Sequence, residues 1–232
     1  QSPAIDFLAT IQGYWGVRAG TPLVTQLPSA SMRHHGKAFI EEYDIRTFFV
    51  DMNVVRDHYT TSQAETLNVM RRDFAETAVR GDLAWFCGFA QGFAGRRSVG
   101  WYAEDSLIHH LNRFADIGRR LTAFTHAPGA EVALFLNNRD IASMDVMHAG
   151  GVVFNSQTKT VFYELKKVAA STDCYLLSDF TPALIEPYKV LIFLNAASMD
   201  RATRRMIRAT LEAQGKTALW LYAPGYVDEN EG

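Results

Sequence analysis

Gly36-Lys-Ala-Phe-Ile-Glu-Glu-Tyr-Asp-Ile-Arg-Thr47 is a short apolar run that ends in two adjacent glutamates, a tyrosine, an aspartate and an arginine. Side chains alternate between the two faces of a β-strand, so a strand here places Glu42, Asp44 and Arg46 on one face and Glu41 on the other. In parallel α/β folds, reactive groups gather at the carboxyl ends of the strands, where loops line a crevice. We therefore take Glu42 as the candidate catalytic carboxylate.

A solvated charged loop with an Arg–Asp pair is the competing interpretation, and composition alone favours it. The buried strand that precedes Glu42 favours the functional interpretation. Paired carboxylates carry out most glycoside hydrolysis, one as proton donor and the other as nucleophile or base. A neighbouring cation such as Arg46 favours the ionised form of a carboxylate, as a nucleophile requires.

The composition limits the class of protein. The chain has 232 residues, 48% hydrophobic and 21% charged, which is typical of a globular protein with one large or two small domains. Its net charge of -2 and a pI near 6.4 provide no basic field for a nucleic acid. No apolar run reaches the roughly 20 residues that a membrane helix needs. We therefore expect neither a nucleic-acid partner nor a membrane span.

The cysteines and the amino end add two expectations. Cys87 and Cys174 lie far apart in apolar surroundings, which predicts buried thiols and neither a disulfide framework nor a metal site. The segment 1–4 has no initiating methionine and no signal-peptide pattern. We expect a piece of a longer protein, with a cytoplasmic and a secreted location both open.

Apolar runs alternate with helical patterns along the chain. The first half is predicted to contain strands at 4–11, 37–43 and 83–88 and helices at 60–80 and 106–122. After Pro128-Gly129, strands are predicted at 132–136, 174–177, 190–195 and 217–222 and helices at 158–170 and 200–214. The segment after residue 11, to about Ser31, is rich in glycine and proline, so any regular structure there is expected to be short at most. Near-continuous hydrophobic strands that alternate with helices indicate parallel sheets covered by helices.

Trp85, on the strand that follows the Glu42 strand, and the pair Trp101-Tyr102, after a glycine-rich loop, are candidates for a wall on which a sugar stacks. Tyr14, with Trp15 and Arg18 in the glycine- and proline-rich segment, is a candidate for lining a polar-ligand site. The alternative for each is ordinary core or loop packing, which is the commoner role of strand tryptophans.

The second half lacks the patterns of two chemistries that its fold can host. Residues 137–143 do not form the phosphate loop that an FMN site needs after the first strand. Cys174 is predicted to begin a strand, whereas an amidotransferase nucleophile lies on a strand-to-helix elbow. A structural or oligomerising domain without a cofactor is therefore expected.

Several segments resemble one known family. Glu42 to Thr47, together with Gly36-Lys37, Arg71 to Ala75, Ala84-Trp85-Phe86 and Gly100-Trp101-Tyr102, resembles the last third of the catalytic barrel in glycoside hydrolase family 42 β-galactosidases and their relatives. Residues from about Glu131 onward, with Tyr188 to Phe193 and Gly215 to Trp220, resemble that family's flavodoxin-like trimerisation domain.

The resemblance implies an α/β chain with two domains. Residues 1–127 would be the C-terminal part of a (β/α)8 barrel, with barrel strands six, seven and eight at 4–11, 37–43 and 83–87. Residues 128–232 would be a flavodoxin-like, doubly wound parallel sheet domain, complete or truncated, that forms a homotrimer.

The implied activity is β-galactosidase-like retaining hydrolysis of terminal sugars, without a cofactor or metal. Glu42 would be the nucleophile, and the substrate contacts would come from Trp85, Asp44, Arg46, Tyr14 and Trp101. The family's general acid, a glutamate at the end of barrel strand four, has no counterpart in this sequence. The chain alone is therefore expected to be inactive and poorly folded in its first half. The alternative is a non-catalytic carbohydrate-binding or oligomerisation protein with a vestigial barrel.

Overall fold

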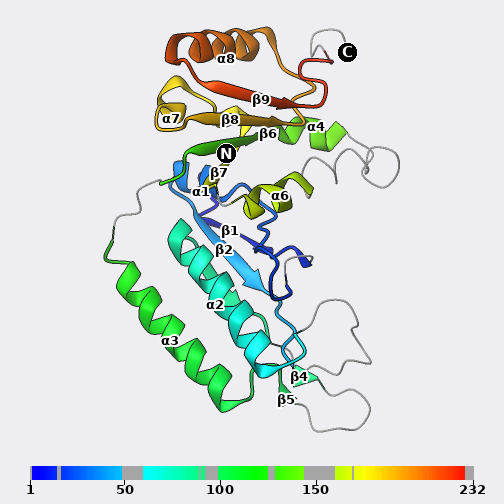
Figure 1. Cartoon of the computed structure of the whole chain (residues 1–232). Helices are drawn as coiled ribbons and strands as arrows, with labels where there is room; N and C mark the ends of the chain where they lie inside the picture. Colours follow the sequence, from blue (N-terminus) through cyan, green and yellow to red (C-terminus); the bar gives the residue numbers. More distant parts are fainter. Residues whose placement is uncertain are drawn as a thin grey trace. The chain divides into compact units, whose positions relative to one another are not determined.

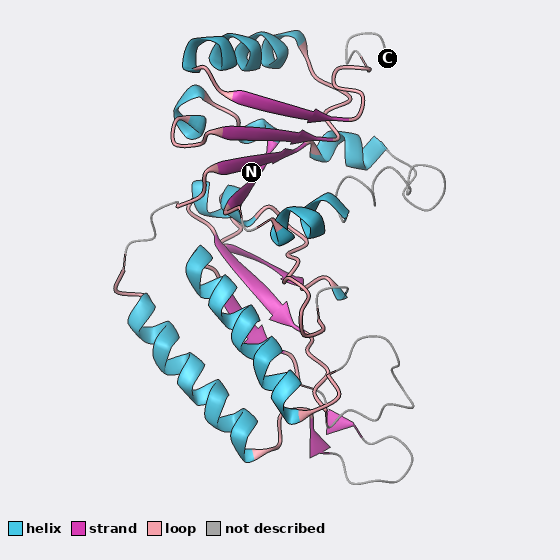
Figure 2. Ribbon diagram, in the orientation of Figure 1, coloured by secondary structure: helices cyan, strands magenta, loops and turns pink. Residues whose placement is uncertain are grey.

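The computed structural model describes residues 2–14, 17–48, 60–88, 90–91, 99–124, 129–143, 160–168 and 170–227. The chain divides into two compact units. Unit 1 takes residues 1–27 and 36–127, and unit 2 takes residues 28–35 and 128–232. Both units combine helices with parallel sheets, so the predicted α/β class is confirmed (Figure 2).

Unit 1 is built on a three-stranded parallel sheet with the order β1-β2-β3. Its strands are β1 (Phe7–Ile11), β2 (Ala38–Tyr43) and β3 (Leu83–Phe86), and its long helices are α2 (Gln63–Arg80) and α3 (Asp105–Leu121) (Figure 1). A two-residue antiparallel pair, β4 (Ala90–Gln91) with β5 (Val99–Gly100), lies in the predicted glycine-rich loop. Residues 92–98 of that loop lie outside the described residues.

The ends of α2 follow from its sequence. The Ser62 side chain accepts a hydrogen bond from the Glu65 backbone N–H at 3.2 Å, and the Glu65 carboxylate accepts one from the Thr61 N–H at 2.7 Å. The first contact satisfies an amide that the first helical turn leaves unpaired, and the second ties Thr61, the residue before the N-cap, to the start of the helix. Gly81 ends the helix with a φ of 72°, a left-handed conformation that glycine adopts without strain.

The two faces of the unit 1 sheet differ sharply in burial. Phe39, Glu41 and Tyr43 are at most 1% exposed on the face of β2 that α2 covers. On the other face, Phe7 is 54% exposed and Leu83 is 52% exposed. Parallel sheets are normally covered on both faces, so the second face of this sheet is an uncovered apolar surface within the described residues.

Unit 2 is a four-stranded, wholly parallel sheet with the order β7-β6-β8-β9. Its strands are β6 (Val132–Leu136), β7 (Thr172–Leu176), β8 (Val190–Leu194) and β9 (Thr217–Leu221). Its helices after residue 128 are α4 (Asn138–Ser143), α6 (Val161–Lys167), α7 (Pro182–Ile185) and α8 (Arg201–Gln214), and a short 3-10 helix, η3, spans Leu177–Asp179.

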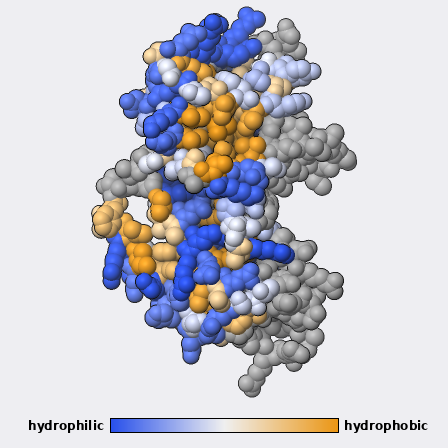
Figure 3. Space-filling view, viewed as in Figure 1, coloured by the Kyte–Doolittle hydropathy of each residue, from blue (hydrophilic) through white to orange (hydrophobic). Residues whose placement is uncertain are grey.

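Helices pack on both faces of this sheet. Phe135 and Phe193 share one buried cluster with Ile185 of α7 and Ile207 of α8. Leu134 and Ile192 share the opposite cluster with side chains of α4 and α6. The unit is therefore doubly wound, as predicted. Figure 3 shows hydrophilic side chains over α8 and apolar side chains gathered over the strands below it.

A helix that the sequence pattern did not predict belongs to unit 2. Helix α1 (Ser29–His34) lies in the segment between β1 and β2, and its six residues agree with the expectation that regular structure there is short at most. The Ser31 hydroxyl accepts a hydrogen bond from the Leu176 N–H at 2.7 Å, and Arg33 forms an ion pair with Asp173 at 3.1 Å. These contacts with edge strand β7 stabilise a six-residue helix that is too short to be stable alone.

Candidate functional site

Glu42 lies at the carboxyl end of β2, between two neighbouring strands. Its Cα pairs with Ile11 of β1 and with Trp85 of β3 in the parallel register. Residues paired in this way point to the same face of a sheet, so Ile11, Glu42 and Trp85 form a row across it. The Trp85 side chain is 41% exposed and Glu42 is half-buried. The row therefore combines an accessible carboxylate with an accessible aromatic ring.

Asp44 and Arg46 form a polar cluster with Tyr14 just beyond the end of β2. The Tyr14 hydroxyl donates to Asp44 Oδ2 at 2.8 Å, and an Arg46 guanidinium nitrogen lies 3.4 Å from the same oxygen. The Arg46 guanidinium also lies 5.4 Å from the centroid of the Tyr14 ring and 6.0 Å from that of Trp101. Asp44 is 5% exposed. The structure thus brings these four predicted site residues together.

Trp101 contributes to this cluster from the protein interior. The residue is 4% exposed, and its carbonyl oxygen accepts a hydrogen bond from the Thr47 hydroxyl. The hydroxyl of the next residue, Tyr102, donates to the Ile45 carbonyl at 3.2 Å. Both residues fix the segment after β2, so a direct contact between Trp101 and a sugar stays a prediction.

Two groups beside the candidate site have raised pKa values. Burial, followed by the hydrogen bond and the charge of Asp44, raises the pKa of Tyr14. Burial, followed by the carboxylate of Glu42, raises the pKa of the Cys87 thiol to about 11. Cys87 lies two residues beyond Trp85, so it falls on the same face as Glu42. Strand parity could have found this neighbour, whereas its apolar surroundings suggested a buried thiol.

Glu41 belongs to a separate buried cluster on the opposite face. Its side chain is inaccessible and lies 3.4 Å from Arg80, which also contacts Glu76 and Asp82, each at 2.9 Å. Burial raises the pKa of Glu41 to about 7, against the opposing charge of Arg80. The alternation predicted from the sequence therefore separates the two adjacent glutamates into different environments.

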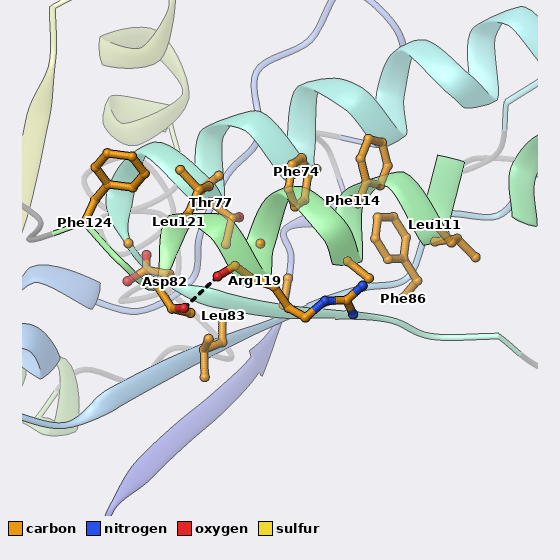
Figure 4. A pocket seen from close by; sticks show the side chains of 16 residues that line it. Phe74, Thr77, Asp82, Leu83, Phe86, Leu111, Phe114, Arg119, Leu121 and Phe124 are labelled. Atoms are coloured by element: carbon orange, nitrogen blue, oxygen red, sulfur yellow. Dashed lines mark hydrogen bonds between the residues drawn. The ribbon is translucent and has the colours of Figure 1, made fainter. Parts of the chain in front are cut away.

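The same buried face carries a cavity of about 610 Å³. It lies between α2, α3 and β3, and Figure 4 shows Phe74, Phe86 and Phe114 along it. Phe74 and Phe114 stack with their ring centroids 4.4 Å apart. Phe86 alternates with Trp85, so this apolar cavity is on the other side of the sheet from the row that contains Glu42.

The described residues show neither a metal-binding cluster nor a membrane-spanning helix. These residues contain no group of three His, Cys, Asp or Glu side chains that could hold a metal ion. No helix within the described ranges is long and apolar enough to cross a membrane. Cys87 and Cys174 are both free thiols.

Comparison with known proteins gave one structural likeness of small extent. No family model and no curated protein matches the sequence. Among solved structures, the chain is similar to a β-galactosidase from Bifidobacterium adolescentis, with a TM-score of 0.37 and 12% sequence identity. The match covers 44% of this chain and 45% of that protein. At this TM-score and identity, the likeness assigns neither a family nor an activity to the chain.

Proposed function

We propose that the chain is the C-terminal part of a retaining, β-galactosidase-like glycoside hydrolase, in which Glu42 is the nucleophile. The single observation that supports this proposal best is the row across the carboxyl end of the parallel sheet, where Glu42 lies between Ile11 and the exposed ring of Trp85. A carboxylate beside an accessible aromatic ring suits a sugar, because the ring packs on sugar C–H groups while the carboxylate attacks the anomeric carbon.

Asp44, Arg46 and Tyr14 would support the nucleophile without reacting. Tyr14 and Arg46 both engage Asp44 Oδ2, so they hold the segment after β2 in a defined shape. Rigid support of this kind is needed because catalytic groups must be held close to their productive geometry. Trp85 would form the sugar platform, and Trp101 would support Arg46 from behind.

Retaining hydrolysis needs a second carboxyl group about 5 Å from the nucleophile. Within strands β1, β2 and β3, Glu42 is the sole carboxylate on the site face. The general acid would therefore come from elsewhere in a longer protein, and the 232 residues alone would not hydrolyse a glycoside. The uncovered apolar face of the unit 1 sheet is where further barrel strands would complete the core. Unit 2 would form the homotrimer.

A non-catalytic carbohydrate-binding protein is the second candidate. It is favoured by a site that has an exposed aromatic ring for a sugar but no identified general acid among the described residues. Within strands β1, β2 and β3 the site face offers the exposed ring of Trp85 and the carboxylate of Glu42, and Asp44 just beyond β2 is 5% exposed and bonded to Tyr14 and Arg46. These groups suit sugar binding, whereas retaining hydrolysis also needs a carboxyl group that can act as the general acid.

The test uses the protein extended upstream of residue 1. Glu42→Gln should abolish turnover of a chromogenic β-galactoside, with a loss on the order of 10⁴-fold or more, while unfolding stays unchanged. Glu41→Gln is the matched control, because it removes the adjacent carboxylate on the opposite face. Retained turnover in Glu42→Gln would exclude the nucleophile assignment. Sugar binding without turnover in the unmodified extended protein would favour the second candidate.

A further inference from the structure

Unit 2 contains a polar cavity of about 220 Å³ at the carboxyl ends of its central strands. The chain goes from β6 to β7 on one side and then to β8 on the other side, so the winding direction reverses between β6 and β8. Open α/β sheets bind ligands in the crevice at this switch point. The cavity is lined by the segments that follow β6, β7 and β8.

The floor of this crevice is fixed by buried side chains. The Asn195 amide nitrogen donates to the Asn137 carbonyl at 2.6 Å, and the Asn137 amide nitrogen donates to the Ser198 carbonyl at 2.8 Å. Asp140 accepts from the backbone N–H groups of Ala197, at 2.6 Å, and Ser198, at 3.1 Å. Asn137, Asp140 and Asn195 are each at most 5% exposed. This hydrogen-bond network keeps the cavity preformed, as is usual for small-molecule binding sites.

The backbone amides that could bind an anion near the cavity already have acceptors. The amides after β8 could cradle a phosphate, but the Asp140 carboxylate already occupies them. At the start of α8, the Thr203 N–H donates to Asp200 at 2.7 Å, so that amide is occupied as well. The hydrogen bond from Thr203 lowers the pKa of Asp200, and the nearby charge of Arg139 lowers it further. Among the residues that line the cavity, the carboxylate of Asp200 and the guanidinium of Arg139 carry opposite charges, so the lining has no net charge to attract an ion.

The remaining groups suit an uncharged ligand that carries hydroxyls. Asp200 can accept hydrogen bonds, and the exposed side chains of Asn138 and Ser178 can donate and accept them. Leu177 and Met199 supply apolar wall. Sites for drug-sized ligands have volumes of about 300–1,000 Å³. This cavity is smaller, so it fits a ligand with a single ring.

We infer that this cavity of unit 2 is a binding site for an uncharged polyhydroxylated ligand of monosaccharide size. The site lies wholly within unit 2 and uses none of the residues around Glu42. It therefore stands or falls separately from the proposed hydrolase activity.

The test is a titration of the full 232-residue chain with D-galactose, D-glucose and inorganic phosphate, followed by amide NMR. One of the sugars should shift the amides of Asn138 and Thr203 saturably, with a Kd on the order of 1–10 mM. Ser178→Trp fills the cavity and should weaken binding at least about 10-fold. Ser171→Trp, at another exposed serine of unit 2, should leave it unchanged, and Asn138→Ala is a second variant if Ser178→Trp does not fold.

Three results would overturn the inference. The first is the absence of saturable shifts up to roughly 100 mM of either sugar. The second is tighter saturation of the same amides by phosphate. The third is unchanged sugar affinity in both Ser178→Trp and Asn138→Ala, because binding would then lie elsewhere.

Discussion

Removing the buried carboxylate of Glu41 should make unit 1 more stable at alkaline pH. Glu41 is inaccessible, and burial raises its pKa from an ordinary 4.5 to about 7. The folded protein therefore holds this proton more tightly than the unfolded chain, and stability falls as the pH rises from about 4.5 through about 7. A difference of one pKa unit corresponds to about 1.4 kcal/mol. The rise in the pKa of Glu41 to about 7 therefore limits the loss of folding free energy caused by its ionisation to about 3 kcal/mol.

Glu41→Gln keeps a neutral side chain of the same shape at every pH. Arg80 retains Glu76 and Asp82, each at 2.9 Å, so it does not become an unpaired buried cation. We expect the variant to match the parent near pH 4 and to exceed its stability by about 1–3 kcal/mol at pH 8. Asp73, whose pKa burial also raises to about 7, keeps titrating in both proteins. In the variant, the free energy of unfolding should therefore still fall with rising pH, but less steeply than in the parent.

The measurement is hydrogen exchange of α2 amides against urea at pH values from 4 to 8.5, because exchange reports the stability of unit 1 separately from unit 2. Glu42→Gln, at the adjacent half-buried position on the opposite face, is the matched control variant. If the parent is no less stable at pH 8 than at pH 5, or if Glu41→Gln follows the parent at every pH, the account of Glu41 as a desolvated carboxyl is refuted.

Four further substitutions are tested by urea unfolding, or by sugar binding where stated. Gly81→Ala should cost about 1 kcal/mol of stability because Gly81 has a φ of 72°. Gly118→Ala, inside α3 with open space around it, should instead stabilise the protein by about 0.5–1 kcal/mol. Equal effects of the two substitutions would contradict the left-handed cap. Ser31→Ala should destabilise unit 2 by about 1–3 kcal/mol, because it leaves the Leu176 N–H without its acceptor, and an unchanged midpoint would show that water replaces the hydroxyl. Trp85→Ala should cost less than about 1 kcal/mol of stability because the residue is 41% exposed. The same substitution should weaken sugar binding in the extended protein. A large loss of stability would instead assign the ring to the core.

The strands were predictable because their hydrophobic runs are continuous and are bounded by polar, glycine or proline residues. The strand at 132–136 was located without error, and those at 190–195 and 217–222 were one residue too long at their carboxyl ends. Ser62 and Gly81 mark the ends of α2 by local hydrogen bonding and a left-handed φ, which are properties of the nearby sequence. Local patterns of this kind survive in the tertiary structure because packing agrees with them.

Helix α1 could not be predicted because its stability comes from distant residues. The partner of Ser31 is 145 residues away, and the segment around it is rich in glycine and proline. The pattern also misplaced β7, which begins at Thr172 and contains Cys174 in its middle. In both cases tertiary contacts override a weak local signal.

At the candidate site, the alternation of side chains along a strand predicted which residues share a face, but it did not predict how deeply each is buried. Glu42 and Trp85 lie in one row, as alternation and parallel pairing require. The burial of Trp101 depends on Arg46 and Thr47 packing around it, and no pattern in the sequence reports such contacts. The roles of these residues with a sugar stay predictions.

The position of α1 in the chain has a consequence for how the protein is made and dissected. During synthesis, α1 emerges with the first strand of unit 1, but its hydrogen-bond partner on β7 emerges 145 residues later. Helix α1 therefore lacks its packing partner until most of the chain has been made. A fragment cut at residue 128 would lack residues 28–35, which belong to unit 2. It would leave the β7 edge bare, and a bare strand edge pairs readily with other chains. A soluble version of unit 2 should therefore carry α1, joined through a new linker.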